Sequence, residues 1–399
     1  MNVSITIKSK LNVDKEDIPK LVEVCEQYRL ACNFVSEWIF NNELELNSVN
    51  ISNNLYHSLR GQFNLKSQFA SSVPKTVTAR YKTVQDQLRK NPYKYQDDSG
   101  KWKYISKTLE WLHKPVYFKR PQADLVRNRD YSFLEEGKIL SINTLQGRIK
   151  CTFETKGFEQ YFKSDFKLGT AKLVESKGNW FLHISATKEV EEFDKTETTN
   201  VIGIDRGIRQ LMTTYDTKGK TEFYSGKTVA QKRNHYKDLR TSLQKRNTKS
   251  SKRRIRKLES RENRWMNDVN HCLSRTLVDK VGANAVLVIE DLSSVREVTT
   301  KVNKDNRYEQ VSWSYHQLEQ FLTYKANLVG SKVVKVSAEY TSQRCIKCGT
   351  IDKNQRKKEI HEYQCQCGYK SNDDRIAAMN IQLLGTLWVS GTEEPKYTK

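Results

Sequence analysis

The chain has 399 residues and a formal net charge of +22, from 69 Lys and Arg against 47 Asp and Glu, with 37% hydrophobic and 10% aromatic residues. This length allows two or three domains with cores of their own, and the aromatic content excludes a wholly disordered chain. The low numbers of glycine (17) and proline (6) exclude a collagen-like or low-complexity protein. Because so high a positive charge repels itself, we expect a polyanionic partner, of which nucleic acid is the commonest.

The sequence contains no run of about 18 or more apolar residues, and the segment Met1–Lys8 lacks the apolar stretch of a secretory signal. We therefore expect a cytoplasmic protein with no membrane partner. An anionic membrane is the weaker alternative, because the basic segments lack a matching apolar face. Four of the eight cysteines lie between residues 345 and 367, which in a reducing compartment suggests a metal site rather than disulfides.

The N-terminal half predicts a strand, then helices, then more strands. Apolar residues alternate over 3–7, which predicts a short strand, and recur every three or four residues over 18–39, which predicts an amphipathic helix followed by others. Alternating patterns over 149–153 and 180–184 predict later strands. The polar stretch 190–200 has no apolar period and predicts a linker before a new domain.

Two short apolar runs each end in a carboxylate. Val201–Ile204 is followed by Asp205, and Ala285–Ile289 is followed by Glu290. Continuous apolar runs of this length predict strands buried on both faces of a sheet. If these strands are parallel neighbours, the two acids lie together at one sheet edge, where such folds bind ligands. Each acid alone also fits a turn or cap residue. Residues 210–225 predict a hairpin between the two runs.

A third acid, Asp374, precedes apolar residues with helical spacing and is expected at the start of a helix. Three acids that converge cannot all stay ionised without cations. Two divalent metal ions about 4 Å apart would relieve the repulsion, activate water on one side of a phosphodiester and stabilise the leaving oxygen on the other. Magnesium fits this carboxylate and water ligation best.

Four cysteines form two pairs, each followed by glycine: Cys345, Cys348, Cys365 and Cys367. Four thiolates in a closed tetrahedral set predict a structural zinc ion. The second pair is Cys-x-Cys, which differs from the common Cys-x2-Cys spacing, so His361 is an alternative ligand. Unmetallated thiols are the other interpretation.

Residues 227–264 contain fifteen basic and three acidic residues, a net charge of +12, with only a thin apolar stripe. They predict a helix, a basic turn at 247–251 and a second helix. A solvated charged face is the usual interpretation of such a run. The density of one charge sign favours contacts with a phosphate backbone, which bind without reading sequence. The predicted contacts are Lys232, Arg233, Lys245, Arg246, Lys252, Arg253, Arg254, Arg256 and Lys257.

Several motifs occur in one order along the second half of the chain. They are Gly203–Gly207, the basic run, Val288–Leu292, Thr341–Gly349, the second cysteine pair and Asp374 with Ala377–Ile381. Together they resemble the TnpB family, transposon-encoded RNA-guided DNA nucleases related to the compact type V CRISPR effectors. The resemblance covers about residues 200 to 385; before that, only length and the order of helices and strands agree.

The resemblance implies a multidomain α+β fold. An N-terminal β-barrel, the wedge domain, would carry an inserted helical recognition lobe. An RNase H-like α/β domain, the RuvC nuclease, would follow with an inserted zinc-binding module. The implied boundaries are 1–12 and 114–190 for the wedge, 13–113 for the recognition lobe, 191–200 for a linker, 201–340 and 370–390 for the RuvC domain, 341–369 for the zinc-binding module and 391–399 for a flexible tail. On this view the opening strand pairs with strands after residue 114.

The resemblance also implies roles for the site residues. Asp205, Glu290 and Asp374 would be the catalytic acids that bind two Mg²⁺ ions, and the four cysteines would bind one Zn²⁺ ion. The residues just before Asp374 differ from the family pattern, so Asp373 is an alternative to Asp374 as the third catalytic acid. The spacing to the following helix favours Asp374.

The implied function is an RNA-guided DNA endonuclease. A guide RNA would pair with target DNA, the protein would read a short adjacent motif, and hydrolysis would use two metal ions. The partners would be guide RNA and target DNA, in the nucleoid region of a prokaryotic cytoplasm. Two alternatives stay open: a nuclease-inactive RNA-guided DNA-binding repressor, and a guide-free RNase H-like resolvase or transposase. The presence of all three acids disfavours the first, and the large N-terminal region has no purpose in the second.

Overall fold

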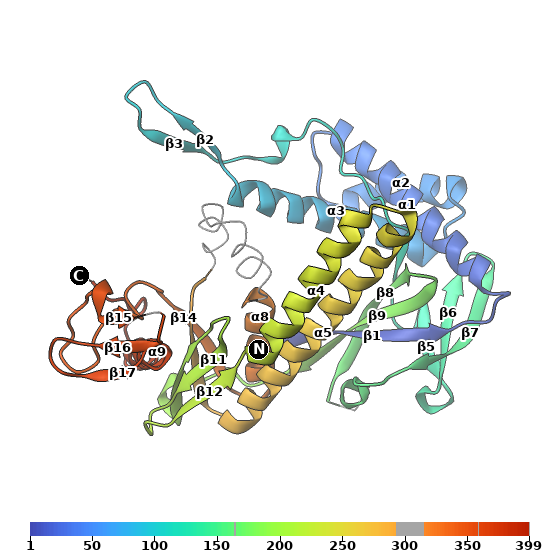
Figure 1. Cartoon of the computed structure of the whole chain (residues 1–399). Coiled ribbons are helices and arrows are strands. Elements are labelled where there is room, and N and C mark those ends of the chain that lie inside the picture. The colour runs from blue at the N-terminus through green and yellow to red at the C-terminus, as the bar shows by residue number, and fades with distance from the viewer. Residues whose placement is uncertain (163–164, 293–314, 358, 399) are drawn as a thin grey trace. The chain divides into compact units, whose positions relative to one another are not determined.

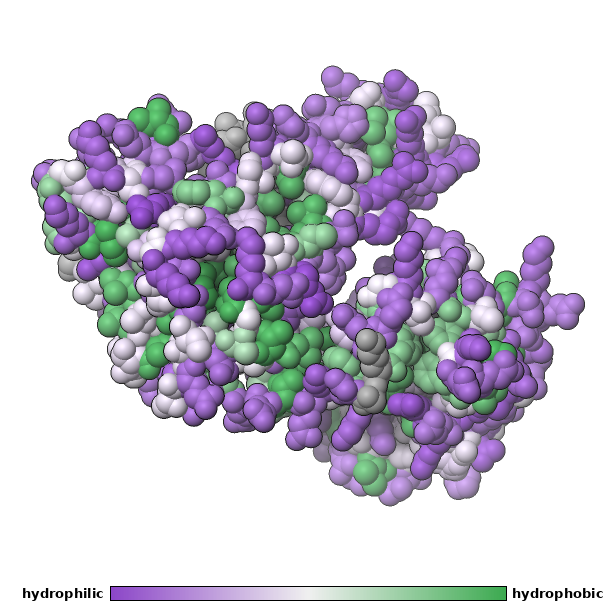
Figure 2. Space-filling model, turned by 90° about the horizontal axis from the view of Figure 1, so that it is seen from below, coloured by the Kyte–Doolittle hydropathy of each residue, from purple (hydrophilic) through white to green (hydrophobic). Residues whose placement is uncertain are grey.

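The computed structural model describes residues 1–162, 165–292, 315–357 and 359–398. The chain forms two compact units, residues 2–188 and residues 189–399 together with Met1, and each unit has hydrophobic clusters of its own. None of the described helices is long and apolar enough to cross a membrane. Hydrophilic residues cover much of the surface seen in Figure 2, with apolar residues exposed between them.

The first unit is built on a seven-stranded sheet (Figure 1). In sheet order its strands are β4 (Gln122–Leu125), β8 (Lys167–Ser176), β9 (Asn179–Glu189), β1 (Asn2–Asn12), β7 (Gly147–Glu154), β6 (Ile139–Thr144) and β5 (Tyr131–Leu134). A bridge between Arg127 and Tyr131 links the chain after β4 to β5, so the sheet is nearly closed. The opening strand lies between β9 and β7, which confirms its predicted pairing with later strands.

Three long helices pack with this sheet: α1 (Ile18–Asn41), α2 (Ser48–Gln62) and α3 (Ser67–Lys90). The amphipathic helix predicted over 18–39 is α1. A hairpin that the sequence analysis did not predict follows α3, formed by β2 (Tyr93–Gln96) and β3 (Trp102–Ile105). Short 3-10 helices are η1 (Leu109–Trp111), η2 (Glu135–Gly137) and η3 (Glu159–Phe162) in this unit, and η4 (Lys195–Glu197) and η6 (Lys353–Gln355) in the second.

The second unit contains a five-stranded sheet. Its order is β12 (Thr221–Ser225), β11 (Gln210–Tyr215), β10 (Asn200–Asp205), β13 (Ala285–Glu290) and β14 (Lys332–Val336). β10, β13 and β14 are parallel, whereas β11 is antiparallel to β10 and forms the predicted hairpin with β12. The two apolar runs are therefore parallel neighbours. This arrangement was the condition for bringing Asp205 and Glu290 together.

Helices cover both faces of this sheet, which explains why its central strands are apolar throughout. On one face, Ile202 and Ile204 pack with α5 (Lys249–Val281) and α8 (Tyr315–Leu328). On the other face, Val201 and Val288 pack with α9 (Asp373–Val389). α4 (Lys227–Arg246) runs beside α5 (Figure 1).

Two glycines allow α9 to lie close against the sheet. A Cβ atom at Gly203 of β10 would lie 2.1 Å from the carbonyl oxygen of Ala378, and one at Gly385 of α9 would lie 2.2 Å from Cγ2 of Val288. Neither position has room for a side chain. The helix that carries Asp374 is thereby held directly on the strand that carries Asp205.

We expect Gly203→Ala to lower the free energy of unfolding by about 3 kcal/mol or more, because the added methyl group meets rigid backbone atoms of α9. Chemical denaturation would measure the loss. Gly169→Ala is the matched control, since the nearest atom to its added Cβ would be Ser185 O at 3.7 Å, an ordinary contact. Equal stability of the two variants would contradict this account of the packing.

The last residues of the second unit form a small sheet and a packed segment. The sheet has the order β15 (Arg356–Lys357), β16 (Glu362–Gln364) and β17 (Lys370–Asn372). The prediction of a flexible tail over 391–399 does not fit Tyr397, which is buried and donates its hydroxyl to Asn380 O at 2.8 Å. Burial of this ring against the α9 side of the sheet offsets the entropy of ordering the segment.

Candidate active site and metal centre

Asp205 and Glu290 are the last residues of two adjacent parallel strands. The register pairs Ile204 of β10 with Ile289 of β13, so the next residue on each strand is an acid at the same sheet edge. Both side chains are partly exposed there. The pairing that the apolar runs suggested thus places both carboxyl groups together.

Asp374 reaches the same edge from the start of α9. Asn372 caps this helix by accepting a hydrogen bond from Arg375 N at 3.1 Å, and Asp374 lies in the first turn. Burial, then the charge of Glu290, then that of Asp374 raise the pKa of Asp205 well above its ordinary value. Glu290 and Asp374 therefore lie close enough to Asp205 to disfavour its ionised form.

Burial also raises the pKa of Glu290 and the pKa of Asp374. Such a cluster favours either bound protons or bound cations, because ionised carboxylates in a poorly solvated site repel each other. Partly exposed carboxylates are the donors that Mg²⁺ takes together with water. The donor set therefore suits hard divalent cations.

Asp373 and Asp374 are adjacent in sequence but have different surroundings. Asp373 is fully buried and accepts from Arg356 Nε at 2.9 Å, and its other carboxylate oxygen lies 3.3 Å from Nδ1 of His361. Asp374 is partly exposed and lies 3.8 Å from Arg356 Nη2. Asp373 is thus already engaged in a buried ion pair, and Asp374 is the more accessible of the two carboxylates.

Two residues that support Glu290 were not among the predicted site residues. Thr341 donates its hydroxyl to Oε1 of Glu290, and the buried Arg206 donates from Nη2 to the Glu290 backbone oxygen at 2.6 Å. Arg206 also forms an ion pair with Glu319 of α8 at 3.6 Å. Both residues fall inside motifs of the sequence, Gly203–Gly207 and Thr341–Gly349, but no spacing rule shows that they contact Glu290.

The four cysteines form a compact cluster. Cys345 Sγ lies 3.7 Å from Cys367 Sγ, Cys348 Sγ lies 3.5 Å from Cys365 Sγ, and all four sulfurs lie within 4.8 Å of one another. A tetrahedral zinc ion with bonds of about 2.3 Å needs sulfurs about 3.8 Å apart. The cluster can therefore hold zinc.

The turns around the cysteines have the backbone that such a cluster needs. Gly349 and Gly368 follow the two pairs with φ of +77° and +84°, the region that favours glycine. His361 lies with Asp373 and Asp374 rather than with the cysteines. The geometry does not support His361 as a substitute zinc ligand.

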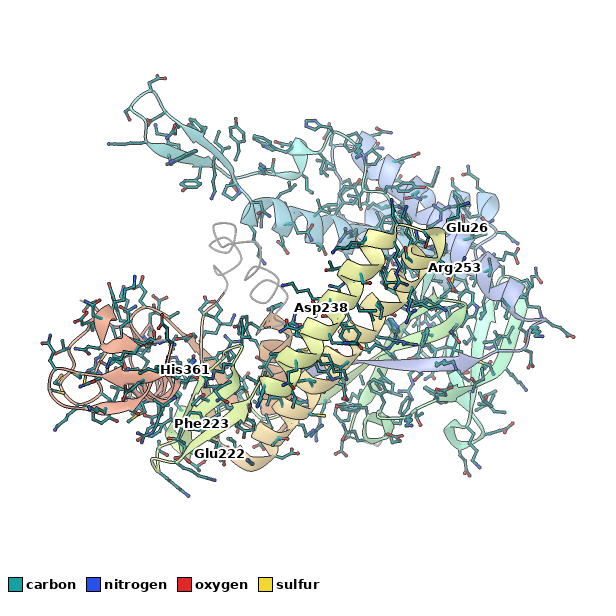
Figure 3. All side chains as sticks on the ribbon, in the orientation of Figure 1. Glu26, Glu222, Phe223, Asp238, Arg253 and His361 are labelled. Carbon is teal, nitrogen blue, oxygen red and sulfur yellow. The ribbon has the colours of Figure 1, made fainter. Side chains whose placement is uncertain are left out.

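The basic run forms a helical hairpin of α4 and α5, and Figure 3 labels Arg253 near its turn. The second helix begins at Lys249, inside the predicted turn 247–251, because Thr248 and Ser251 form a reciprocal capping box. Eight of the nine predicted contacts are exposed: Lys232, Lys245, Arg246, Lys252, Arg253, Arg254, Arg256 and Lys257.

Arg233 differs from this prediction. Its side chain is buried and lies 4.0 Å from the carboxylate of Glu262, a buried acid that also pairs with Arg240. Arg233 and Glu262 therefore join α4 to α5. The helical period turns this arginine inward, so it is not positioned to contact a phosphate from the hairpin surface.

Two family models match the second half of the chain. The model described as "Probable transposase" matches residues 183–311, and that of the "Cas12f1-like, TNB domain" matches residues 315–381. A CRISPR-associated endodeoxyribonuclease Cas12f1 from Sulfoacidibacillus thermotolerans is 27% identical over 56% of this chain and 55% of its own length. A TnpB-like protein, MJ0751, from Methanocaldococcus jannaschii is 30% identical over 32% of this chain and 45% of its own length. The chain thus spans about half the length of these relatives.

Solved structures share the fold at low sequence identity. A Cas12f1 in a complex with sgRNA and target DNA matches with a TM-score of 0.63 at 15% identity, covering 92% of this chain and 83% of that chain. A Cas-phi3 mini-RNA-guided endonuclease matches with a TM-score of 0.53 at 10% identity, covering 100% and 94%. The mixed α/β fold of this chain, with its nearly closed sheet and its cysteine cluster, therefore matches the fold of these two structures.

Proposed function

We propose, from the now confirmed resemblance to the TnpB family, that this chain is an RNA-guided DNA endonuclease that cuts by metal-assisted phosphodiester hydrolysis. The observation that carries the proposal is the meeting of Asp205, Glu290 and Asp374 at one sheet edge. This edge lies within the residues matched by the transposase and Cas12f1-like models. The acids that these motifs would need for catalysis are all present.

Each acid has a defined part in this proposal. Asp205, Glu290 and Asp374 would hold two Mg²⁺ ions, which when bound supply an activated water and a stabilised leaving oxygen. Thr341 fixes one oxygen of Glu290, so that its carboxylate keeps one orientation. Arg206 anchors the Glu290 backbone from the buried side, and α9 holds Asp374 against β10. These residues preorganise the acids before the substrate arrives.

The finer fold assignment belongs to the same proposal. The five-stranded sheet of the second unit would be the RNase H-like RuvC domain, with the cysteine cluster and β15–β17 as an inserted zinc-binding module. The nearly closed sheet of the first unit would be the wedge domain, and α1–α3 the recognition lobe. The domain boundaries implied by the sequence motifs are retained as part of this proposal, except that residues 391–399 are not a flexible tail, since Tyr397 is buried there.

Guide RNA and target DNA would be the partners, and the exposed charges of the α4–α5 hairpin would follow their phosphates. We expect the triple variant Lys252→Ala, Arg253→Ala and Arg254→Ala to weaken nucleic-acid binding uniformly across sequences and to reduce the salt dependence, d log K/d log[salt], by about 2 to 3. Binding titrations at several salt concentrations measure both effects. Lys252→Arg keeps the charge and should keep the slope. An unchanged slope in the triple variant would show that these residues of the hairpin do not contact the nucleic-acid phosphates.

The proposed function is tested by expressing the chain together with candidate guide RNA from its own locus, sequencing the RNA that copurifies, and offering DNA that matches the guide. Cleavage that needs both the guide and Mg²⁺ supports the proposal. Specific binding without strand breakage would instead indicate a nuclease-inactive repressor. Full cleavage after complete removal of RNA would indicate a guide-free resolvase or transposase.

A further inference from the structure

The β2–β3 hairpin and the 3-10 helix after it carry large aromatic side chains in exposed positions. Tyr93 is 47% exposed, Trp102 60%, Tyr104 61% and Trp111 41%. Within the first unit the hairpin extends beyond the end of α3 (Figure 1). Aromatic groups exposed together in this way mark an interaction surface more often than scattered single residues do.

The pairing register separates the hairpin side chains into two faces. Tyr93 pairs with Ile105 and Tyr95 with Lys103, and these residues share one face because the two members of a cross-strand pair point the same way. The other face carries Lys94, Gln96, Trp102 and Tyr104.

Three rings follow one another from the first face to the 3-10 helix, and we call Tyr95, Tyr93 and Trp111 the aromatic row. The rings of Tyr95 and Tyr93 are nearly parallel, at 21°, with centroids 6.2 Å apart. Those of Tyr93 and Trp111 are inclined by 35° with centroids 5.8 Å apart.

The rings of the row present faces to which unpaired bases can stack. Tyr93 and Trp111 are both exposed, and the Tyr93 and Tyr95 rings have nearly the same orientation. Backbone register and ring geometry thus provide a platform for unpaired bases.

The charges beside the row fit phosphate. Lys107 Nζ lies 5.8 Å from the centre of the Trp111 ring. Lys103 is the cross-strand neighbour of Tyr95 and remains exposed, although it also pairs with Asp97 at 3.2 Å. Lysine is depleted in the cores of protein–protein interfaces, whereas rings interleaved with basic groups are the pattern of single-strand binding surfaces.

We propose that the aromatic row binds single-stranded DNA, with bases stacked on its rings and phosphates near Lys103 and Lys107. The inference rests on the proposed function, because guide pairing would leave one DNA strand displaced and unpaired while the guide's own bases are paired. No group of the row is placed to select one base, so binding is independent of sequence.

The test measures binding of the full chain, without guide RNA or divalent metal, to a short labelled oligothymidine by fluorescence anisotropy. Tyr93→Ala combined with Trp111→Ala is expected to weaken binding about tenfold or more, with an unchanged salt slope, because stacking releases no counterions. Lys103→Ala combined with Lys107→Ala should lower the slope by about 1.4. Tyr93→Phe keeps the ring and should keep the affinity.

Trp102→Ala, on the other face of the hairpin, is the matched control and should bind like the wild type. Equal losses in Trp102→Ala and in the row variant, or tighter row-dependent binding of oligouridine than of oligothymidine, would overturn the proposal. The binding test measures no cleavage, so it and the guided cleavage assay can fail independently. If the chain cleaves DNA but the row variant binds oligothymidine like the wild type, this inference is wrong and the proposed function stands. If binding depends on the row but the chain does not cleave, the proposed function is wrong and this inference stands.

Discussion

Asp205→Asn is expected to lower the rate of guided DNA cleavage by at least about a thousandfold, while the protein still binds guide RNA and target DNA. Asp205 shares its sheet edge with Glu290 and Asp374, and the substitution removes one of the carboxylates that would hold the metal ions. A metal ion contributes several kcal/mol of charge stabilisation to the transition state, and about 4 kcal/mol corresponds to this factor. Single-turnover cleavage of matched DNA in Mg²⁺ measures the effect.

Asp238→Asn is the control, because Asp238 is an exposed acid on α4 in the same unit (Figure 3). It should cleave like the wild type. Glu290→Gln and Asp374→Asn should repeat the loss seen for Asp205→Asn. Retained cleavage in Asp374→Asn together with a loss in Asp373→Asn that leaves the fold intact would reverse the assignment between these two neighbours.

Asp205→Asn should slow cleavage, but without metal it should make the folded protein more stable. Burial and the neighbouring acids raise the pKa of Asp205, so the folded chain keeps a proton that the unfolded chain releases. The stability of the metal-free protein therefore falls as pH rises above the ordinary pKa of a carboxyl group. Asp205→Asn removes this penalty, so in EDTA its Tm should exceed that of the wild type at about pH 8, and the difference should vanish near pH 3.

With Mg²⁺ bound, the Tm of the wild type should exceed that of Asp205→Asn. Added Mg²⁺ is expected to raise the Tm of the wild type more than that of Asp205→Asn, because only the intact set of acids binds the ions fully. Thermal unfolding with EDTA and with Mg²⁺ measures both comparisons. A wild type more stable than the variant in EDTA at about pH 8 would show that the acids do not repel one another in the folded chain.

Cys345→Ser is expected to abolish stoichiometric zinc binding and to unfold the segment around the cysteine cluster. The wild type should carry one zinc ion per chain, since its four sulfurs have tetrahedral spacing. Structural zinc contributes about 10 to 16 kcal/mol of apparent binding free energy in zinc-finger peptides, and this energy is lost with a ligand. Elemental analysis gives the zinc content, and limited proteolysis reports unfolding of the segment.

Loss of zinc should also slow cleavage by at least about tenfold, because losing the residues that support metal ligands typically lowers activity by about this factor. Arg356 and His361 lie in the cysteine-bearing segment and contact the buried Asp373 beside Asp374. Figure 3 labels His361. Cys272→Ser provides the control, because Cys272 is an exposed cysteine of α5 outside the cluster. Normal zinc content in Cys345→Ser would show that the zinc ion has other ligands.

The central strands and the site acids could be predicted from local patterns. Val201–Ile204 and Ala285–Ile289 are apolar at every position, a pattern that only strands covered on both faces need, and each is followed by its acid. The four cysteines and the basic run could be identified because each group is concentrated within a short segment. The sequence alone did not show that the two strands pair in parallel, which is needed to bring the two acids to one sheet edge. The structure shows this parallel pairing.

Tertiary structure alone separated residues that are neighbours in sequence. Asp373 faces a buried ion pair while Asp374 faces the acids, and Arg233 is buried against Glu262 while Lys232 is exposed. Residue type and spacing describe how a segment alternates, but the partner that a side chain meets comes from a distant part of the chain.

The same limit applies to the aromatic row, whose ring spacing depends on a hairpin register and on the position of the following 3-10 helix. By itself the sequence determined which chemical groups the protein has: acids after buried strands, a set of four thiols and a dense positive charge. Only the fold decided which of these groups face one another, because burial and charge interactions depend on distances in space rather than along the chain.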